Sequence, residues 1–313
     1  MNTSHSLWAV VAENPFILME AAVSELISHR NDTAVQQDLG CAPCIYDQKG
    51  QKELRAIYSG FLAAARDGDV PLLVTAPTWR TNQDMVRSAH APTTINRDAV
   101  RFMRGLIREL GREMYRPICI GGLLGPCGDA YRPEMSLDAK TAAAFHAWQA
   151  EELALAGVDY LMAATLPAVE EAVGLAQAMT KTGIPSIVSF VLNREGKILD
   201  GFSLDQAIQR IDAECSPPPA GYMINCSYPS FFRPQEETGR VMARLFGIQA
   251  NASSQDHQEL DRAQTIQADP LEDWGDRMLD LHRRWGLTIL GGCCGTGEQH
   301  LRYLVQKGAA GSE

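Results

Sequence analysis

Three cysteines stand in two short segments of the chain. Cys226 ends an apolar run that reads Ile-Asn-Cys-Ser, and the adjacent pair Cys293 and Cys294 stands between glycines in residues 291–296, GGCCGT. Thiolates suit Zn²⁺, and a site with three protein ligands leaves a fourth position for water or substrate. The glycines permit the bend that two adjacent cysteines need to share one ion. These residues therefore predict a zinc site; the alternative is three buried apolar thiols.

The segments between and around these cysteines alternate in pattern. Short apolar runs rich in β-formers are separated by amphipathic stretches, and we count eight such runs, at 16–20, 70–76, 117–122, 158–163, 184–192, 222–226, 245–250 and 287–290. Strands alternating with helices predict parallel pairing. The pattern is typical of a (β/α)8 TIM-type barrel, and we expect a single domain over residues 1–313.

Two helices have clear start and stop signals. A helix over 136–156 has Ser136 or Asp138 as its cap and Gly157 as its end. A second helix is expected over 169–180. The carboxyl ends of parallel barrel strands carry the functional residues, and Cys226, Cys293 and Cys294 all fall there. Barrel closure is therefore expected to bring the three cysteines together.

Composition excludes several classes of partner. The chain has 313 residues, and 28 basic against 38 acidic residues give a net charge of −10, which repels a phosphate backbone. The longest apolar runs fall short of the roughly 18 residues that span a membrane. The start of the chain lacks the pattern of a secretion signal, so we expect a cytoplasmic protein whose eight cysteines are thiols or metal ligands rather than disulfides.

The chain resembles the homocysteine S-methyltransferase family over most of its length. Besides the GGCCGT motif and the Asn225 and Cys226 pair, the resemblance includes residues 125–126, 156–159, 166–167, 189–190 and 200–201. It implies a zinc-bearing barrel in which Cys226, Cys293 and Cys294 hold the ion and an acceptor thiol is the fourth ligand. A free thiol has a pKa near ~8.5, and coordination to zinc deprotonates it.

The resemblance also implies an activity. It points to a zinc-dependent S-methyltransferase that converts homocysteine to methionine, an activity of methionine biosynthesis with two small-molecule partners, the thiol acceptor and the methyl donor. A chain of this size lacks room for cobalamin and folate modules, so we expect S-methylmethionine or S-adenosylmethionine as the donor. No catalytic residue beyond the metal centre is expected.

Parts of the substrate-binding pattern differ from the family. The Asp-Gly-Gly type loop after the first strand is replaced by residues 19–25, and Ala164 stands where the family has a Glu that receives the substrate's ammonium group. Residues 76–79 read Ala-Pro-Thr-Trp, so they keep only the final threonine and aromatic residue of the family's Thr-Asn-Thr-aromatic motif. Either Glu20 supplies the lost carboxylate, or the acceptor has no amino acid head group.

We expect the substrate to contact residues at the strand ends. Glu20, Thr78, Trp79 and Asn225 are the candidate binding residues, with Glu25 as a further one, and Trp79 is placed to stack on a methylated cation. The alternative for each of them is a role in bracing loops.

Several alternatives remain at this stage. The alternatives to homocysteine methylation are a methyltransferase for a different thiol and a non-catalytic zinc-binding or thiol-binding barrel. The glycine-rich loop also suits a phosphate, but no basic residue lies within it. Cys41 and Cys44 have CxxC spacing without the βαβ context of a redox site, so we expect a structural role, with a lid over the barrel mouth as the functional alternative.

Overall fold

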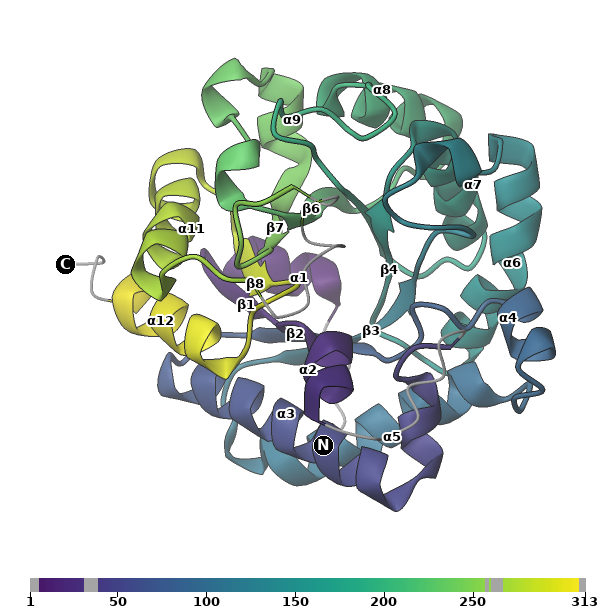
Figure 1. Ribbon diagram of the computed structural model, residues 1–313, viewed down its shortest axis with the longest axis horizontal. Coiled ribbons are helices and arrows are strands. Elements are labelled where there is room, and N and C mark those ends of the chain that lie inside the picture. The colour runs from purple at the N-terminus through teal and green to yellow at the C-terminus, as the bar shows by residue number, and fades with distance from the viewer. Residues whose placement is uncertain (1–5, 31–38, 257–258, 260–266, 310–313) are drawn as a thin grey trace.

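A closed barrel of parallel strands forms the centre of the protein (Figure 1). The computed structural model describes residues 6–30, 39–256, 259 and 267–309. Eight strands follow one another around the barrel in chain order, and β8 returns to β1 through the pairs Ile17 with Ile289 and Leu18 with Leu290. The strands are β1 (Ile17–Met19), β2 (Leu72–Ala76), β3 (Ile118–Leu124), β4 (Tyr160–Leu166), β5 (Ser186–Phe190), β6 (Gly221–Ser227), β7 (Leu245–Ala250) and β8 (Ile289–Gly292). Each coincides with a predicted apolar run, so the predicted (β/α)8 barrel is confirmed.

Helices surround the strands on the outside, except for α1, which lies behind the barrel in this view (Figure 1). They are α1 (Leu7–Glu13), α2 (Val23–Arg30), α3 (Gln48–Asp67), α4 (Gln83–Ser88), α5 (Ile95–Leu110), α6 (Ala139–Leu155), α7 (Val169–Thr180), α8 (Leu204–Glu214), α9 (Gly239–Arg244), α11 (Leu271–Trp285) and α12 (Glu298–Ala309). Short 3-10 turns lie between them at Ala42–Tyr46, Gly111–Glu113, Pro133–Met135, Pro229–Phe231 and Pro234–Glu236. None of the described helices combines the length and the apolar character needed to cross a membrane.

The capping signals act as expected at α6. Asp138 caps α6, because its carboxylate accepts a hydrogen bond from the backbone N–H of Thr141 at 3.0 Å. Ser136, the other candidate cap, lies in the preceding turn. Gly157 follows α6 with φ of 79°, a left-handed conformation that glycine adopts without strain. The bounds of α7 are those that the sequence predicts.

Side chains fill the barrel and close its amino-terminal end. Tyr160 crosses the interior, its hydroxyl donating to the carbonyl of Val74 at 3.1 Å. At Gly121 a Cβ would lie 2.6 Å from Cε2 of this ring, so only glycine fits there. Leu7 and Val10 of α1 belong to the same buried cluster as Ile17 at the start of β1. The carboxyl ends of the strands form the opposite face, which is left for a site.

Candidate metal centre and active site

The three predicted cysteines meet at the carboxyl ends of β6 and β8. The sulfur atoms of Cys226, Cys293 and Cys294 all lie within 4.8 Å of one another. Cys226 belongs to β6, and the other two follow β8 directly. Barrel closure explains the meeting, because β7 is the one strand between β6 and β8.

Two of the three sulfurs are bonded to each other in the structure. Cys226 and Cys293 form a disulfide with 5.4 Å between their Cα atoms, while Cys294 is not part of a disulfide. The expectation of thiols without disulfides is therefore wrong for this pair. Two sulfurs close enough to share an ion are also close enough to bond, so binding of a metal by all three requires the reduced pair.

The backbone at the ends of β4 and β6 is strained. Thr165 and Cys226 have φ of 64° and 50°, values that side chains other than glycine rarely adopt. Asn225 holds this arrangement: its Oδ1 accepts from the N–H of Thr165 at 2.8 Å and from the hydroxyl of Ser189 at 2.7 Å, and its Nδ2 donates to Thr165 Oγ1 at 2.7 Å. Nδ2 also lies 3.3 Å from the sulfur of Cys226. Strain of this kind collects at functional sites, where surrounding bonds over-determine it.

The loop after β8 is bent and anchored at Gly295. Its φ of 79° is left-handed, as predicted for the turn, and its N–H donates to the carboxylate of Glu25. Gly291 and Gly292 have another role, because they are the last two residues of β8 and neighbouring atoms lie close to them. A Cβ on Gly291 would lie 2.8 Å from that of Met19. These two glycines therefore allow close packing rather than the bend.

The thiol of Cys294 lies in an environment that opposes its ionisation. Burial and the charge of Glu25 raise the pKa of the Cys294 thiol to about 12, although a hydrogen bond with Tyr131 lowers it. A thiolate at this position therefore needs a nearby positive charge. A divalent cation held by three cysteines supplies such a charge.

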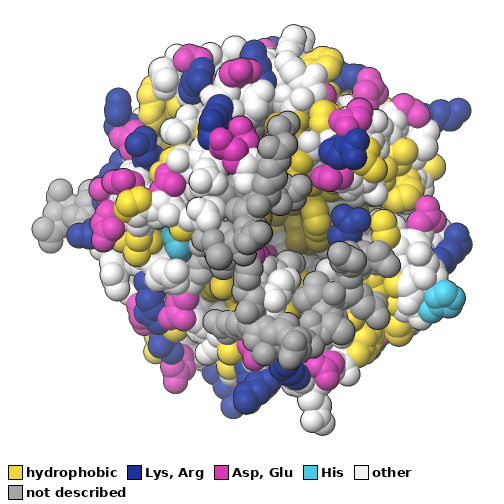
Figure 2. All heavy atoms as spheres, in the orientation of Figure 1, with side chains coloured by type: hydrophobic (Ala, Val, Ile, Leu, Met, Phe, Trp, Pro, Cys, Tyr) yellow, Lys and Arg dark blue, Asp and Glu magenta, His cyan; other side chains and the backbone are white. Residues whose placement is uncertain are grey.

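A cavity of about 350 Å³ opens beside the cysteines at the barrel mouth. Figure 2 shows, on this face, a hollow floored by hydrophobic side chains with a Lys or Arg side chain at its edge. The predicted residues that line the cavity are Glu20, Glu25, Trp79, Ala164, Asn225, Cys226, Cys293 and Cys294. Residues that sequence reasoning missed also line it, among them Tyr58, Thr75, Arg80, Tyr131, Thr165 and Gln249.

Glu20 forms part of the cavity wall at the end of β1. Its carboxylate is only 5% exposed and accepts from the N–H of Thr75 at 2.9 Å and from the hydroxyl of the same residue. Burial raises the pKa of Glu20 to about 7, although hydrogen bonds from Thr75 and Tyr58 lower it. Ionisation of this buried carboxylate is therefore costly, and an approaching cation stabilises the ionised form.

Thr78 and Trp79 differ in position although they are neighbours. Trp79 lines the cavity and donates from Nε1 to the carbonyl of Ala164 at 3.2 Å, which connects the ends of β2 and β4. Thr78 does not line the cavity. It is fully buried, and its hydroxyl donates to the carbonyl of Leu123 at 2.9 Å and accepts from the N–H of Leu123 at 3.1 Å. Thr78 therefore ties the loop after β2 to β3.

Cys41 and Cys44 flank a turn beside the cavity. Both are buried and free, and Cys41 lines the cavity with its sulfur 3.1 Å from the hydroxyl of Ser24. Burial raises the pKa of the Cys41 thiol to about 12. The two cysteines thus pack as neutral thiols, in agreement with the structural role, and Cys41 adds to the wall of the barrel mouth.

The three cysteine sulfurs are compatible with one metal ion. A tetrahedral zinc ion with Zn–S near 2.3 Å sets its sulfur ligands about 3.8 Å apart, so the bonded sulfurs of Cys226 and Cys293 must separate before they can share the ion. The separation of at most 4.8 Å applies to all three pairs. All three cysteines also line the cavity.

Comparison with solved structures gives a clear neighbour. The metallated form of the homocysteine methyltransferase MmuM from Escherichia coli superimposes with a TM-score of 0.75 at 17% identity, covering 96% of this chain and 99% of that one. Its oxidised form gives a TM-score of 0.74 at 18% identity, again with 96% and 99% coverage. At these identities the likeness shows the barrel fold. A search among curated proteins finds no match.

The family follows from the sequence itself. The family model described as homocysteine S-methyltransferase matches residues 17–307, from the first residue of β1 into α12. The matched span includes all eight strands and the three converging cysteines. The chain belongs to the homocysteine S-methyltransferase family, and it is a methyltransferase.

Proposed function

We propose that this enzyme binds zinc through Cys226, Cys293 and Cys294 and methylates homocysteine to methionine, with S-methylmethionine or S-adenosylmethionine as the donor. The observation that carries the proposal is the meeting of three cysteine sulfurs within 4.8 Å at the edge of a substrate-sized cavity. When bound, zinc supplies the positive charge that keeps an acceptor thiol ionised at neutral pH.

The residues around the cysteines support this chemistry in two ways. Asn225 fixes Cys226 through its bonds to Thr165 and its contact with the sulfur, so the ligand is held before a metal arrives. Glu25 fixes the loop of Cys294 through Gly295. Prior positioning of this kind lowers the cost of ordering the site on binding.

Glu20 is the residue that we assign to the ammonium group of homocysteine. It lines the same cavity as the cysteines and is buried enough that an ammonium partner shifts it to its ionised form. Ala164, the position at which the family resemblance calls for a Glu, also lines the cavity and offers no charge. A carboxylate on β1 thus replaces one on β4.

The methyl transfer needs no general acid or base from the protein. The acceptor sulfur attacks the methyl carbon of the sulfonium donor, a new S–C bond forms, and the C–S bond of the donor breaks with its electron pair returning to the donor sulfur. The thiol proton leaves to solvent before attack. Glu20 and Glu25 give the cavity wall a negative character that favours a positively charged donor.

Product analysis tests the proposal. Reduced enzyme reconstituted with zinc is incubated with homocysteine and each donor, and methionine is quantified by mass spectrometry. We expect methionine from the wild type and none above background from Cys294→Ser. Glu20→Gln should retain zinc and raise the KM for homocysteine. Absence of methionine with both donors, from zinc-loaded enzyme, would reject the proposed reaction.

A further inference from the structure

Arg80 differs from every other residue that lines the cavity. Among the described residues it is the one lining residue that carries a positive charge. Its guanidinium makes no hydrogen bond or ion pair in the described part of the chain, and its Nε is buried without a partner. A buried donor without an acceptor destabilises the folded protein. The structure therefore keeps an unused donor and an uncompensated charge at the cavity wall.

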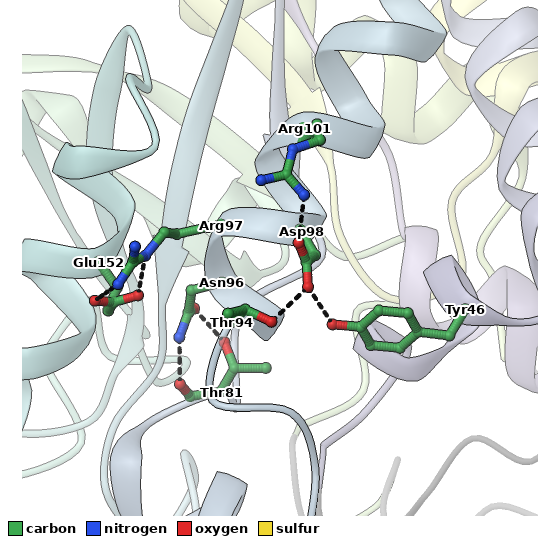
Figure 3. Close-up of polar contacts among 8 residues, drawn as sticks. All are labelled: Tyr46, Thr81, Thr94, Asn96, Arg97, Asp98, Arg101 and Glu152. Atoms are coloured by element: carbon green, nitrogen blue, oxygen red, sulfur yellow. Dashed lines mark hydrogen bonds and ion pairs between the residues drawn. The ribbon is translucent and has the colours of Figure 1, made fainter.

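The loop that carries Arg80 is rigidly held. Thr81, the next residue, donates from its hydroxyl to Asn96 Oδ1 at 2.6 Å and accepts at its carbonyl from Asn96 Nδ2 at 2.9 Å (Figure 3). Asn96 lies on α5, which is fixed in turn by Arg97 paired with Glu152 on α6 and by Asp98, which accepts from Tyr46 (Figure 3). The backbone next to Arg80 is thus held by the scaffold.

The aromatic neighbour of Arg80 supports the side chain. The guanidinium carbon lies 5.6 Å from the centroid of the Trp79 ring. This contact places a cation on the ring and orients the guanidinium while leaving its N–H groups free for an acceptor. Trp79 is fixed by its bond to the carbonyl of Ala164. The ring that was expected to stack on a methylated substrate cation therefore already has Arg80 beside it.

An anionic group of the substrate satisfies this arrangement. The other charged lining residues, Glu20 and Glu25, are acidic, so a ligand that is only cationic leaves Arg80 unpaired. A carboxylate matches the planar fork of a guanidinium and accepts two hydrogen bonds from it. We propose that Arg80 binds a carboxylate of the acceptor, and that the acceptors of this enzyme are thiols that carry a carboxylate, with or without an amino group.

This inference rests on the proposed thiol methylation and specifies its acceptor. Homocysteine belongs to the class, and so does 4-mercaptobutanoate, which is homocysteine without its amino group. The matched uncharged thiol is 4-mercaptobutanol. Arg80 contributes only to binding, so its effect is expected in KM and not in kcat.

The test compares these two thiols with a sulfonium donor and zinc-loaded enzyme. We expect kcat/KM of the wild type to be at least about tenfold higher for 4-mercaptobutanoate, the scale of one charged hydrogen-bonded contact. Arg80→Gln should raise the KM for the carboxylate at least about tenfold, leave the alcohol little changed, and so remove the preference. Arg80→Lys should retain part of it. Arg87→Gln, an exposed residue of α4 outside the cavity lining, is the control.

The possible outcomes separate this inference from the proposed function. If both thiols are methylated and the wild type shows no preference, or Arg80→Gln keeps the preference, Arg80 does not bind the carboxylate while methyl transfer stands. If no thiol is methylated, the proposed function fails, and calorimetric titration of the two thiols still decides the role of Arg80. If Arg80→Gln does not fold, the preference of the wild type for 4-mercaptobutanoate over 4-mercaptobutanol alone decides whether Arg80 binds the carboxylate.

Discussion

Replacing Glu20 by glutamine should remove a pH-dependent cost from the folded state. Burial raises the pKa of Glu20 from 4.5 to about 7. Between these values the folded protein keeps a proton that the unfolded chain has lost, so its stability falls as the pH rises through this range. Below pH 4.5 Glu20 imposes no such cost, and above pH 7 the cost is constant. A glutamine side chain does not titrate, so the Glu20→Gln variant lacks this dependence.

The size of the effect follows from the two pKa values. One pKa unit corresponds to about 1.4 kcal/mol, so a rise from 4.5 to about 7 corresponds to about 3 kcal/mol. The glutamine side chain keeps an oxygen for the N–H of Thr75 and an amide that donates to its hydroxyl, so packing at the end of β1 is retained. The variant is therefore expected to gain about 3 kcal/mol relative to the wild type between about pH 4.5 and about pH 8.

Urea unfolding of reduced, metal-free protein at about pH 4.5, 6 and 8 measures this difference. Taking the variant minus the wild type at each pH cancels the titration of all other groups. Glu195→Gln, at an exposed loop position, is the control and should show no change with pH. A difference for Glu20→Gln that stays constant within about 0.5 kcal/mol would refute the burial argument, since this is the scatter expected of surface substitutions.

Three further substitutions test the site. Thr78→Val removes both hydrogen bonds to β3 and should cost about 1–3 kcal/mol in urea unfolding with an unchanged KM; a raised KM at full stability would contradict its bracing role. Asn225→Ala should weaken zinc about 10–100-fold in chelator competition, and unaltered affinity would exclude its positioning role. Gly125→Ala places a Cβ 2.6 Å from Trp79 Nε1, so it should displace the ring and raise the KM for the acceptor. The control Gly105→Ala, whose Cβ would have nothing within 4 Å, should leave this KM unchanged. Equal KM values for the two variants would show that acceptor binding does not depend on the position of Trp79.

Much of the barrel follows from the sequence because its strands are buried on both faces. Such strands read as continuous apolar runs, and residues such as Val74 and Leu161 have no solvent-facing polar neighbours to interrupt the pattern. Chain order then places Cys226 and Cys293 at ends of strands separated by one neighbour. The convergence of the cysteines therefore follows from the order of the strands, and it could be predicted from the sequence.

The cavity wall was less accessible from the sequence because its loops are shaped by distant contacts. The direction of Thr78 toward Leu123 depends on how β2 and β3 align, which its residue type does not encode. The exposure of Arg80 to the cavity depends on Thr81 bonding to Asn96 on α5. Tyr131 reaches Cys294 from the loop after β3, and no local pattern marks it.

Metal analysis of the reduced protein tests the central claim most directly. Purified enzyme is reduced, incubated with zinc, desalted and measured by inductively coupled plasma mass spectrometry. If Cys226, Cys293 and Cys294 hold one ion as we propose, we expect one zinc per chain for the wild type and for Cys215→Ser, whose thiol lies after α8 away from the cavity. Cys226→Ser and Cys294→Ser should each lose the ion. Metal-free wild type, or zinc retained at full stoichiometry and affinity in both variants, would contradict the account.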